Sequence, residues 1–234
     1  VLADLEVLQK RYDKASKLIK TGEKKYKEEC AVLERLLKHM EDGAPARTLE
    51  LSEEEKELVR GFSLLSMKPM IYAANVEEDA LSGVENNALV AQVRQAAQKE
   101  GAEIVVVSAK VEEELAQLED EERTMFLNEL GLESAGLDRL VEASYRLLGL
   151  ISYLTAGPKE VRAWTIEKGT KAPQAAGKIH SDFEKGFIRA EIVTYEDLVA
   201  CGSIAAAREK GLYRSEGKEY VIQDGDVVLF RFNV

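Results

Sequence analysis

Two groups of residues, most of them polar, stand directly after two short apolar runs in the middle of the sequence. Asn75, Val76 and Glu78 follow the run 69–74. Ser108, Ala109 and Lys110 follow the run 103–107. Short apolar runs are typical of parallel strands buried on both faces. Ligands of open α/β sheets bind beyond the carboxyl ends of the strands. Amide, carboxylate and ammonium groups at this edge therefore predict a ligand-binding site.

The two groups can be compared with the base-binding motifs of P-loop GTPases. Those enzymes place Asn-Lys-x-Asp and then Ser-Ala-Lys at two strand ends, where the Asp carboxylate accepts both donor hydrogens of guanine. Here Val76 replaces the lysine and Glu78 the aspartate. The longer Glu78 carboxylate cannot reach the same position unless the base shifts, and a misregistered polar site discriminates strongly. The pattern therefore favours adenine over guanine. In the alternative interpretation, Asn75 caps a turn and Ser108 begins a helix.

A phosphate-binding motif does not accompany these groups. A Walker A loop requires Gly-x-x-x-x-Gly-Lys-Ser/Thr, because its backbone N–H groups wrap the phosphates and its hydroxyl binds Mg²⁺. No such string occurs in the 234 residues. The pattern predicts a base-recognition half-site without a phosphate site and without a catalytic residue in this chain.

Charge and periodicity divide the chain into three predicted domains. The net charge is −11, and most of it falls in the second segment. The domains are residues 1–66, a helical arm, residues 67–148, with alternating strands and helices, and residues 149–234, rich in strands. Alternation of strand and helix predicts a parallel sheet with crossover helices. Only two strands are visible in the second domain, which predicts half of a doubly wound domain.

The first domain contains two apolar seams with helical spacing. One seam runs from Leu5 to Ile19 and the other from Tyr26 to Met40, with a break at Gly22. Seams joined by a short break predict an antiparallel helical hairpin, and Ser52 with Glu55 predicts a capping box that opens a third helix.

Basic residues gather near the tip of the predicted hairpin. Residues 10–27 contain eight basic and two acidic residues. Since phosphate contacts need cations at the reachable end of an arm, we name the RNA-contact candidates Lys17, Lys20, Lys24 and Lys25. A solvated lysine-rich helix face is the alternative.

The third domain is predicted to be a mixed sheet with short helices. We expect strands at 161–166 and 187–193, a helix at 172–179, and a hairpin in which Asp224-Gly225 joins strands 218–222 and 227–232. Mixed strands wrapped on one or two helices in about 85 residues predict a β-grasp module.

Several long strings resemble the YchF-like branch of the Obg-related GTPases. They include the two strand-end groups, residues 160–165, residues 175–191 and the ending 224–234. The resemblance covers the whole chain and implies an α/β multi-domain protein. Its parts are an antiparallel α-helical hairpin, a partial doubly wound, Rossmann-like P-loop G domain whose Walker A half is absent, and a C-terminal β-grasp TGS domain.

The resemblance also implies a function. Members of this family hydrolyse ATP in preference to GTP and associate with ribosomes, and Asn-x-x-Glu is the feature linked to that choice. We therefore expect a regulatory, ribosome-associated ATPase, with Mg²⁺ bound by residues outside this chain. A non-catalytic RNA- or ribosome-binding module is the alternative.

Composition argues against several other classes of protein and of partner. The net charge argues against a basic nucleic-acid-coating protein, and no DNA specificity is expected. Cys30 and Cys201 form no CxxC pair, so a disulfide framework or zinc site is not predicted. No apolar run suggests a membrane partner, and we expect a cytoplasmic protein. For His180 we expect a structural or partner-binding role and not catalysis. For the acidic run, residues 112–114 and 119–122, we expect a solvated helix face and not a cation site.

Overall fold

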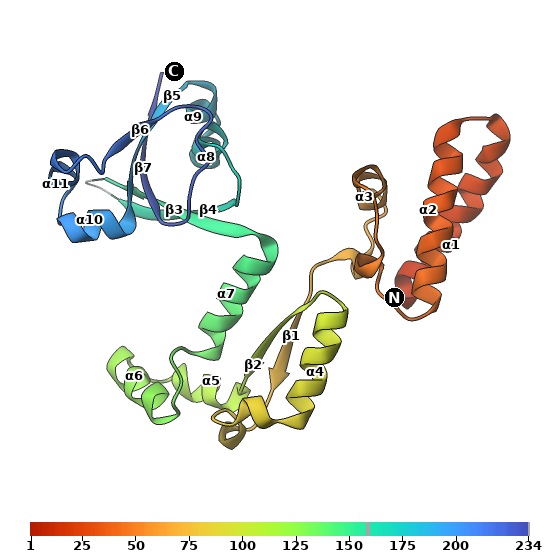
Figure 1. The fold of residues 1–234 in the computed structure, drawn as a ribbon, viewed down its shortest axis with the longest axis horizontal. Helices are drawn as coiled ribbons and strands as arrows, with labels where there is room; N and C mark the ends of the chain where they lie inside the picture. Colours follow the sequence, from red (N-terminus) through yellow and green to blue (C-terminus); the bar gives the residue numbers. More distant parts are fainter. Residues whose placement is uncertain (158–159, 234) are drawn as a thin grey trace. The chain divides into compact units, whose positions relative to one another are not determined.

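The computed structural model describes residues 1–157 and 160–233, which form two compact units, Val1–Ala143 and Ser144–Val234 (Figure 1). The elements of the first unit are α1 (Leu2–Leu18), α2 (Lys24–Glu41), α3 (Glu53–Arg60), β1 (Ile71–Asn75), α4 (Ala88–Lys99), β2 (Glu103–Val107), α5 (Ala109–Leu115), α6 (Asp120–Glu129) and α7 (Gly136–Leu148), which runs across the boundary. The three predicted domain boundaries stay predictions.

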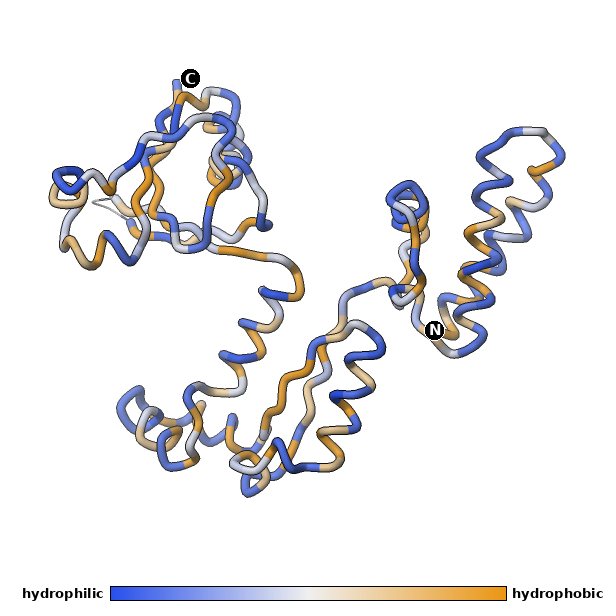
Figure 2. The backbone as a smooth tube through the Cα atoms, in the orientation of Figure 1, coloured by the Kyte–Doolittle hydropathy of each residue, from blue (hydrophilic) through white to orange (hydrophobic). Residues whose placement is uncertain are grey.

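Helices α1 and α2 form the predicted antiparallel hairpin (Figure 1). The chain reverses at Gly22, whose φ of 82° lies in the left-handed region that glycine adopts without steric cost. The predicted seams meet in a core that contains Leu8, Leu33 and Met40, all almost fully buried. The tip between the helices is mostly hydrophilic (Figure 2).

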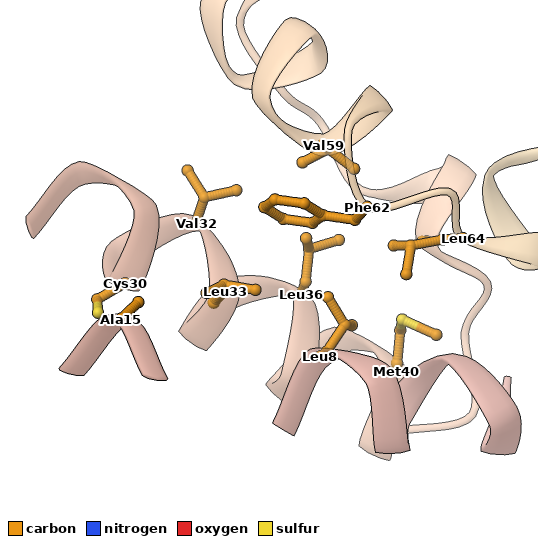
Figure 3. Close-up of a cluster of buried hydrophobic side chains, with 11 residues drawn as sticks. Leu8, Ala15, Cys30, Val32, Leu33, Leu36, Met40, Val59, Phe62 and Leu64 are labelled. Atoms are coloured by element: carbon orange, nitrogen blue, oxygen red, sulfur yellow. The ribbon is translucent and has the colours of Figure 1, made fainter. Parts of the chain in front are cut away.

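The hairpin core also receives side chains from the following segment. Val59, Phe62 and Leu64 pack onto the hairpin beside Val32 and Leu36 (Figure 3). Helix α3 begins with the predicted capping box, in which the Ser52 hydroxyl accepts the Glu55 N–H. The two-seam pattern did not reveal this third layer, because Val32 and Leu36 lie beside the predicted seam rather than on it.

Strands β1 and β2 form a parallel two-stranded sheet in which Ile71 pairs with Glu103 and Asn75 with Val107. Both strands are largely hydrophobic (Figure 2). Helix α4 packs on the pair, and Val90 and Ala97 are its buried residues. The expectation of strands buried on both faces holds in the middle of β2, where the consecutive Val105 and Val106 are buried, but was wrong for β1. That strand has no fully buried residue, since a two-stranded sheet is covered on too little of its surface. The helical spacing of Leu89, Val90, Val93, Ala96 and Ala97 predicts an inner face of α4 that includes Leu89, but Leu89 is 71% exposed.

The second unit contains a five-stranded mixed sheet. Its elements are β3 (Leu150–Ala156), β4 (Val161–Glu167), α8 (Ala172–Ile179), α9 (Ser181–Lys185), β5 (Phe187–Thr194), α10 (Tyr195–Cys201), α11 (Ile204–Glu209), β6 (Arg214–Glu216) and β7 (Asp226–Phe232). The strand order is β4-β3-β7-β5-β6, and only β3 and β7 pair in parallel. Helix α8 covers one face over Tyr153, Ile192 and Phe230, while Val193 and Val227 on the other face pack with α10 and α11 residues.

The prediction of a hairpin at Asp224-Gly225 was wrong. Residues 218–222 form no strand, and β7 pairs with β5 and β3 instead. The turn is held by Ser152, which is far from it in the sequence. Asp224 Oδ1 accepts the Ser152 N–H at 2.8 Å, and the Gly225 N–H donates to the Ser152 carbonyl at 2.8 Å. Within the described part of the chain, no helix is long and apolar enough to span a membrane.

Candidate functional site

The ends of β1 and β2 are tied together by Asn75. Its side-chain Oδ1 accepts the backbone N–H of Ala109 at 2.9 Å, across 34 positions of the chain. Ala109 is the first residue of α5, whose first N–H groups have no acceptor within the helix. Parallel pairing places both strand ends at one edge, and Asn75 then fixes the start of α5 beside that edge.

A second link joins Glu78 and Lys110. The Lys110 ammonium donates to Glu78 Oε2 at 3.0 Å and lies 3.9 Å from Glu114. The hydrogen bond to Glu78 raises the pKa of Lys110. Both side chains remain open to solvent, with 37% of Glu78 and 64% of Lys110 exposed. The pair is therefore accessible to a ligand.

Val76 and Ser108 have supporting positions. Val76 is half-buried and packs against Leu81 and Val111 and their neighbours, and its N–H donates to the Val107 carbonyl at 2.9 Å. Ser108 is only 2% exposed, and its side chain does not cap α5. The structure therefore places all six predicted site residues at one edge, with Asn75, Glu78 and Lys110 exposed there and Ser108 beneath them.

Two depressions flank the segment 77–79. The first, about 500 Å³, is lined by Glu77, Glu78, Asp79, Ser82, Lys110, Glu129 and Leu130. The second, about 530 Å³, lies between β1 and α4 and includes Asn75, Val76, Leu89 and Val90. Glu129 and Leu130 reach the first depression from the end of α6. No local pattern in the sequence predicts this approach, since it depends on the packing of α6 against the Val111 cluster.

The first depression is electrically negative. Glu77, Glu78, Asp79 and Glu129 contribute four carboxylates against the single ammonium of Lys110. Such a site favours groups with N–H or O–H donors and disfavours phosphate. Within the described residues, no group of three or more His, Cys, Asp or Glu side chains could hold a metal ion.

The predicted RNA-contact lysines lie where α1 ends and α2 begins. All four, Lys17, Lys20, Lys24 and Lys25, are exposed. Lys24 pairs with Glu28 and Lys25 with Glu23, at 3.0 and 2.9 Å. Arg11, from the same basic run, instead pairs with Glu29 and lies 4.1 Å from the centre of the Phe62 ring.

His180 and the acidic run have structural contacts. His180 Nδ1 accepts the Asp182 N–H at 3.2 Å at the start of α9. In the acidic run, Glu112 Oε1 accepts the Gly136 N–H at 2.6 Å and its Oε2 accepts that of Leu137 at 3.2 Å, which caps α7. The contact of His180 agrees with the structural role favoured from the sequence. Glu112 departs from the predicted solvated helix face, because it is half-buried and caps α7, whereas Glu113 and Glu114 are exposed.

The fold defines a mixed α/β protein with a helical hairpin, a parallel strand pair whose carboxyl ends carry polar side chains, and a C-terminal sheet domain. Residues 150–233 match the family YchF-GTPase_C, described as "Protein of unknown function (DUF933)".

The whole chain is similar to proteins called Ribosome-binding ATPase YchF. It is 54% identical to that of Bacillus subtilis and 51% identical to that of Escherichia coli O157:H7, and covers 64% and 63% of their lengths. The solved structure "Structure of the Schizosaccharomyces pombe YchF GTPase" is 33% identical with a TM-score of 0.84, over 98% of this chain and 62% of that one. The YchF-like resemblance is confirmed, since this chain aligns over its whole length with the C-terminal part of the YchF proteins.

Proposed function

We propose that this protein is a ribosome-associated nucleotide-binding protein that hydrolyses ATP in preference to GTP, with a regulatory role in translation or stress. The observation that carries the nucleotide assignment is the joined strand edge, where Asn75 links the two loops and Glu78 faces solvent beside Lys110. Relatives named Ribosome-binding ATPase YchF support the activity and the partner. The chain spans less than two thirds of their length.

The Glu78–Lys110 pair supports the preference for adenine. Guanine offers two donor hydrogens on one edge and needs both oxygens of one carboxylate. One oxygen of Glu78 already accepts from Lys110 at 3.0 Å. Adenine presents an acceptor beside a donor, so a single carboxylate oxygen suffices for its amino group. In this proposal Glu78 accepts from the adenine amino group, while Val76 and the Ser108–Lys110 loop border the base.

The negative depression supports binding of a base there and not of phosphates. We assign phosphate binding and Mg²⁺ to parts of the relatives that this chain does not span. The 234 residues then offer base contacts alone. We expect no ATP turnover and at most millimolar binding, about −4 kcal/mol, and micromolar binding in calorimetry would contradict this expectation.

The base assignment is tested by exchanging the two departures from the guanine motif. In the complete protein, Val76→Lys with Glu78→Asp is expected to shift the ATP-to-GTP affinity ratio toward GTP by about tenfold or more. Glu77→Gln, which removes a carboxylate from the same depression but not the predicted acceptor, is the control. A ratio that moves equally in both variants would contradict base reading by Glu78.

We assign ribosome association in part to the hairpin tip. Four exposed lysines at the end of a projecting arm suit contact with RNA phosphates. Changing Lys17, Lys20, Lys24 and Lys25 to Glu is expected to weaken co-sedimentation with ribosomes and to flatten its salt dependence. Unchanged pelleting across a salt series would contradict the assignment. The alternative, a non-catalytic RNA- or ribosome-binding module, predicts this loss together with the absence of nucleotide hydrolysis in the complete protein.

The finer architecture belongs to the same proposal. The strand order β4-β3-β7-β5-β6, with a parallel central pair and α8 on one face, supports a TGS-type β-grasp domain. The parallel β1–β2 pair with α4 supports the C-terminal half of a P-loop G domain. A cytoplasmic location follows from the proposed ribosomal partner.

A further inference from the structure

Two arginines of the C-terminal sheet and one from helix α11 converge on one buried carboxylate. Glu191 on β5 has a side chain that is only 10% exposed. Arg189 Nη2 donates to its Oε1 at 2.9 Å, Arg231 Nη2 donates to its Oε2 at 3.1 Å, and Arg208 Nη2 lies 3.5 Å from that oxygen. The Tyr213 hydroxyl also donates to Oε2 at 3.1 Å. We call Arg189, Arg208 and Arg231 the arginine cluster.

The positive charge of the cluster exceeds the negative charge of the carboxylate that it surrounds. Arg189 on β5 and Arg231 on β7 are directly opposite each other in the sheet register, an arrangement that is unfavourable for like charges unless an anion lies between them. Glu191 supplies one negative charge against three positive charges. The excess of two lies in a unit, Ser144–Val234, whose total net charge is +1, and in a protein of net charge −11.

The guanidinium groups are both oriented and accessible. The side chains of Arg189, Arg208 and Arg231 are 51%, 54% and 48% exposed. Arg208 also lies 4.4 Å from the centre of the Tyr213 ring, which restrains its plane. A guanidinium carries five N–H donors in a fixed fork. Since Glu191 accepts two donors from Arg189 and one from Arg231, the other donors of the cluster remain for an anion, at a reduced cost in side-chain entropy.

The surroundings favour an extended polyanion. Arg189 and Arg231 stand on the sheet itself, near Leu229, which is 43% exposed and pairs with Glu191 in the register, and Arg208 reaches them from α11. A hollow described in this unit shares Leu229 with this surface, but its lining includes Trp164, Phe183 and Phe232 and none of the three arginines. A peptide is usually bound in a groove or along a free strand edge, whereas a nucleic-acid backbone can lie on an exposed face that offers several cations.

We propose that the arginine cluster binds backbone phosphates of RNA, as a second contact separate from the hairpin tip. Glu191 acts as the positioning residue that holds the arginines. The inference rests on the proposed ribosome association only for the source of the RNA, and a defined RNA makes its test independent of that association and of nucleotide binding.

The test uses the full chain with Lys17, Lys20, Lys24 and Lys25 changed to Gln, so that the tip no longer contributes. In this background we compare Arg189→Gln/Arg231→Gln with Arg162→Gln/Arg214→Gln. The control pair has the same charge change and lies in the same sheet, where each arginine rests on an aromatic ring. The probe is a fluorescein-labelled 20-nucleotide RNA hairpin, measured by anisotropy over a salt series.

We expect the cluster variant to lose about tenfold in affinity at about 0.1 M salt, and about two units in the slope of log K against log salt. The control pair should change the slope by much less. Equal losses in the two pairs would overturn the proposal. It would also be overturned if polyglutamate displaced the labelled RNA as well as poly-uridylate does at the same concentration of charge, because that result would indicate an acidic protein partner. If the double variant does not fold, Arg208→Gln alone should lower the slope by about one, and an unchanged slope would overturn the proposal.

Discussion

Two of the ion-paired glutamates of this protein, Glu78 and Glu191, are held in opposite ways. Glu78 meets a single lysine at a strand end, and both partners face solvent. Glu191 lies in the middle of a strand under three arginines, and its side chain is 10% exposed. A solvent-exposed pair contributes little to stability and exchanges partners readily. A buried carboxylate with several charged donors is fixed.

The comparison shows which member of each pair is available for a ligand. At the strand edge the carboxylate itself is open, so the proposed ligand group is a donor such as an amino group. On the sheet the carboxylate is fully engaged, so the open members are the arginines and the proposed ligand is an anion. The same residue types therefore predict opposite ligands, and burial decides between them.

The largest expected effect comes from removing each carboxylate in turn. Glu191→Gln leaves three guanidinium groups around a neutral amide, and we expect the free energy of unfolding of Ser144–Val234 to fall by about 2 kcal/mol. Glu78→Gln is the matched substitution, and we expect no measurable change in stability. Trp164, the single tryptophan of the chain, reports denaturation of the second unit by fluorescence, and circular dichroism follows the whole chain. Equal stabilities of the two variants would contradict the comparison.

Acid should reproduce part of this effect. Hydrogen bonds from Arg231, joined by those from Arg189 and Tyr213, outweigh the effect of burial and lower the pKa of Glu191 from 4.5 to about 2. Because the folded-state pKa is depressed, the stabilisation is complete above about pH 4.5 and is lost as the pH falls toward about 2. The difference in midpoint temperature between wild type and Glu191→Gln, about 10 °C at pH 7, should therefore shrink steadily below pH 4.5. A constant difference down to pH 2.5 would argue against the depressed pKa.

A smaller effect is expected at the strand edge, in ligand choice. Lys110→Ala frees the second oxygen of Glu78, so both oxygens can meet the two donors of guanine. In the complete protein we expect the ATP-to-GTP affinity ratio to shift toward GTP by about threefold to tenfold, with little change in the midpoint of unfolding. Competition binding of the two nucleotides measures the shift. Lys99→Ala, on α4, is a control lysine outside the depression. An unchanged ratio for Lys110→Ala would show that the occupied oxygen of Glu78 does not set the adenine preference.

Periodicity predicted most elements of the arm and of the C-terminal sheet. The spacing of Leu8, Leu33 and Met40 places them in the observed core, and the Ser52–Glu55 box begins α3 as expected. Strand β3 was not predicted, because Leu150–Ala156 continues an apolar stretch that begins in α7, and Gly149 alone separates the two. The segment 218–222 was wrongly assigned because a turn signal shows that the chain bends, and not which strands pair. Ser152, more than 70 residues away, holds that turn.

The base-site candidates were predictable as a set because parallel strands end at one edge, and strand order in the sequence is enough to state that. The role of each candidate residue was not predictable from the sequence motifs. That Asn75 binds the start of α5, and that Lys110 occupies one oxygen of Glu78, depends on distances between loops more than 30 residues apart.

The sequence by itself determined the local elements, the hairpin with its basic tip and the edge at which Asn75, Glu78 and Lys110 gather, because these depend on periodicity, caps and charge along short stretches. Only the tertiary structure decided how many charged partners each carboxylate has and how much water reaches it. Arg189 is two residues from Glu191, but Arg208 and Arg231 come from a helix and a strand 17 and 40 residues further along. Desolvation and ion pairing act through space, so the sequence could not distinguish the open Glu78 from the enclosed Glu191.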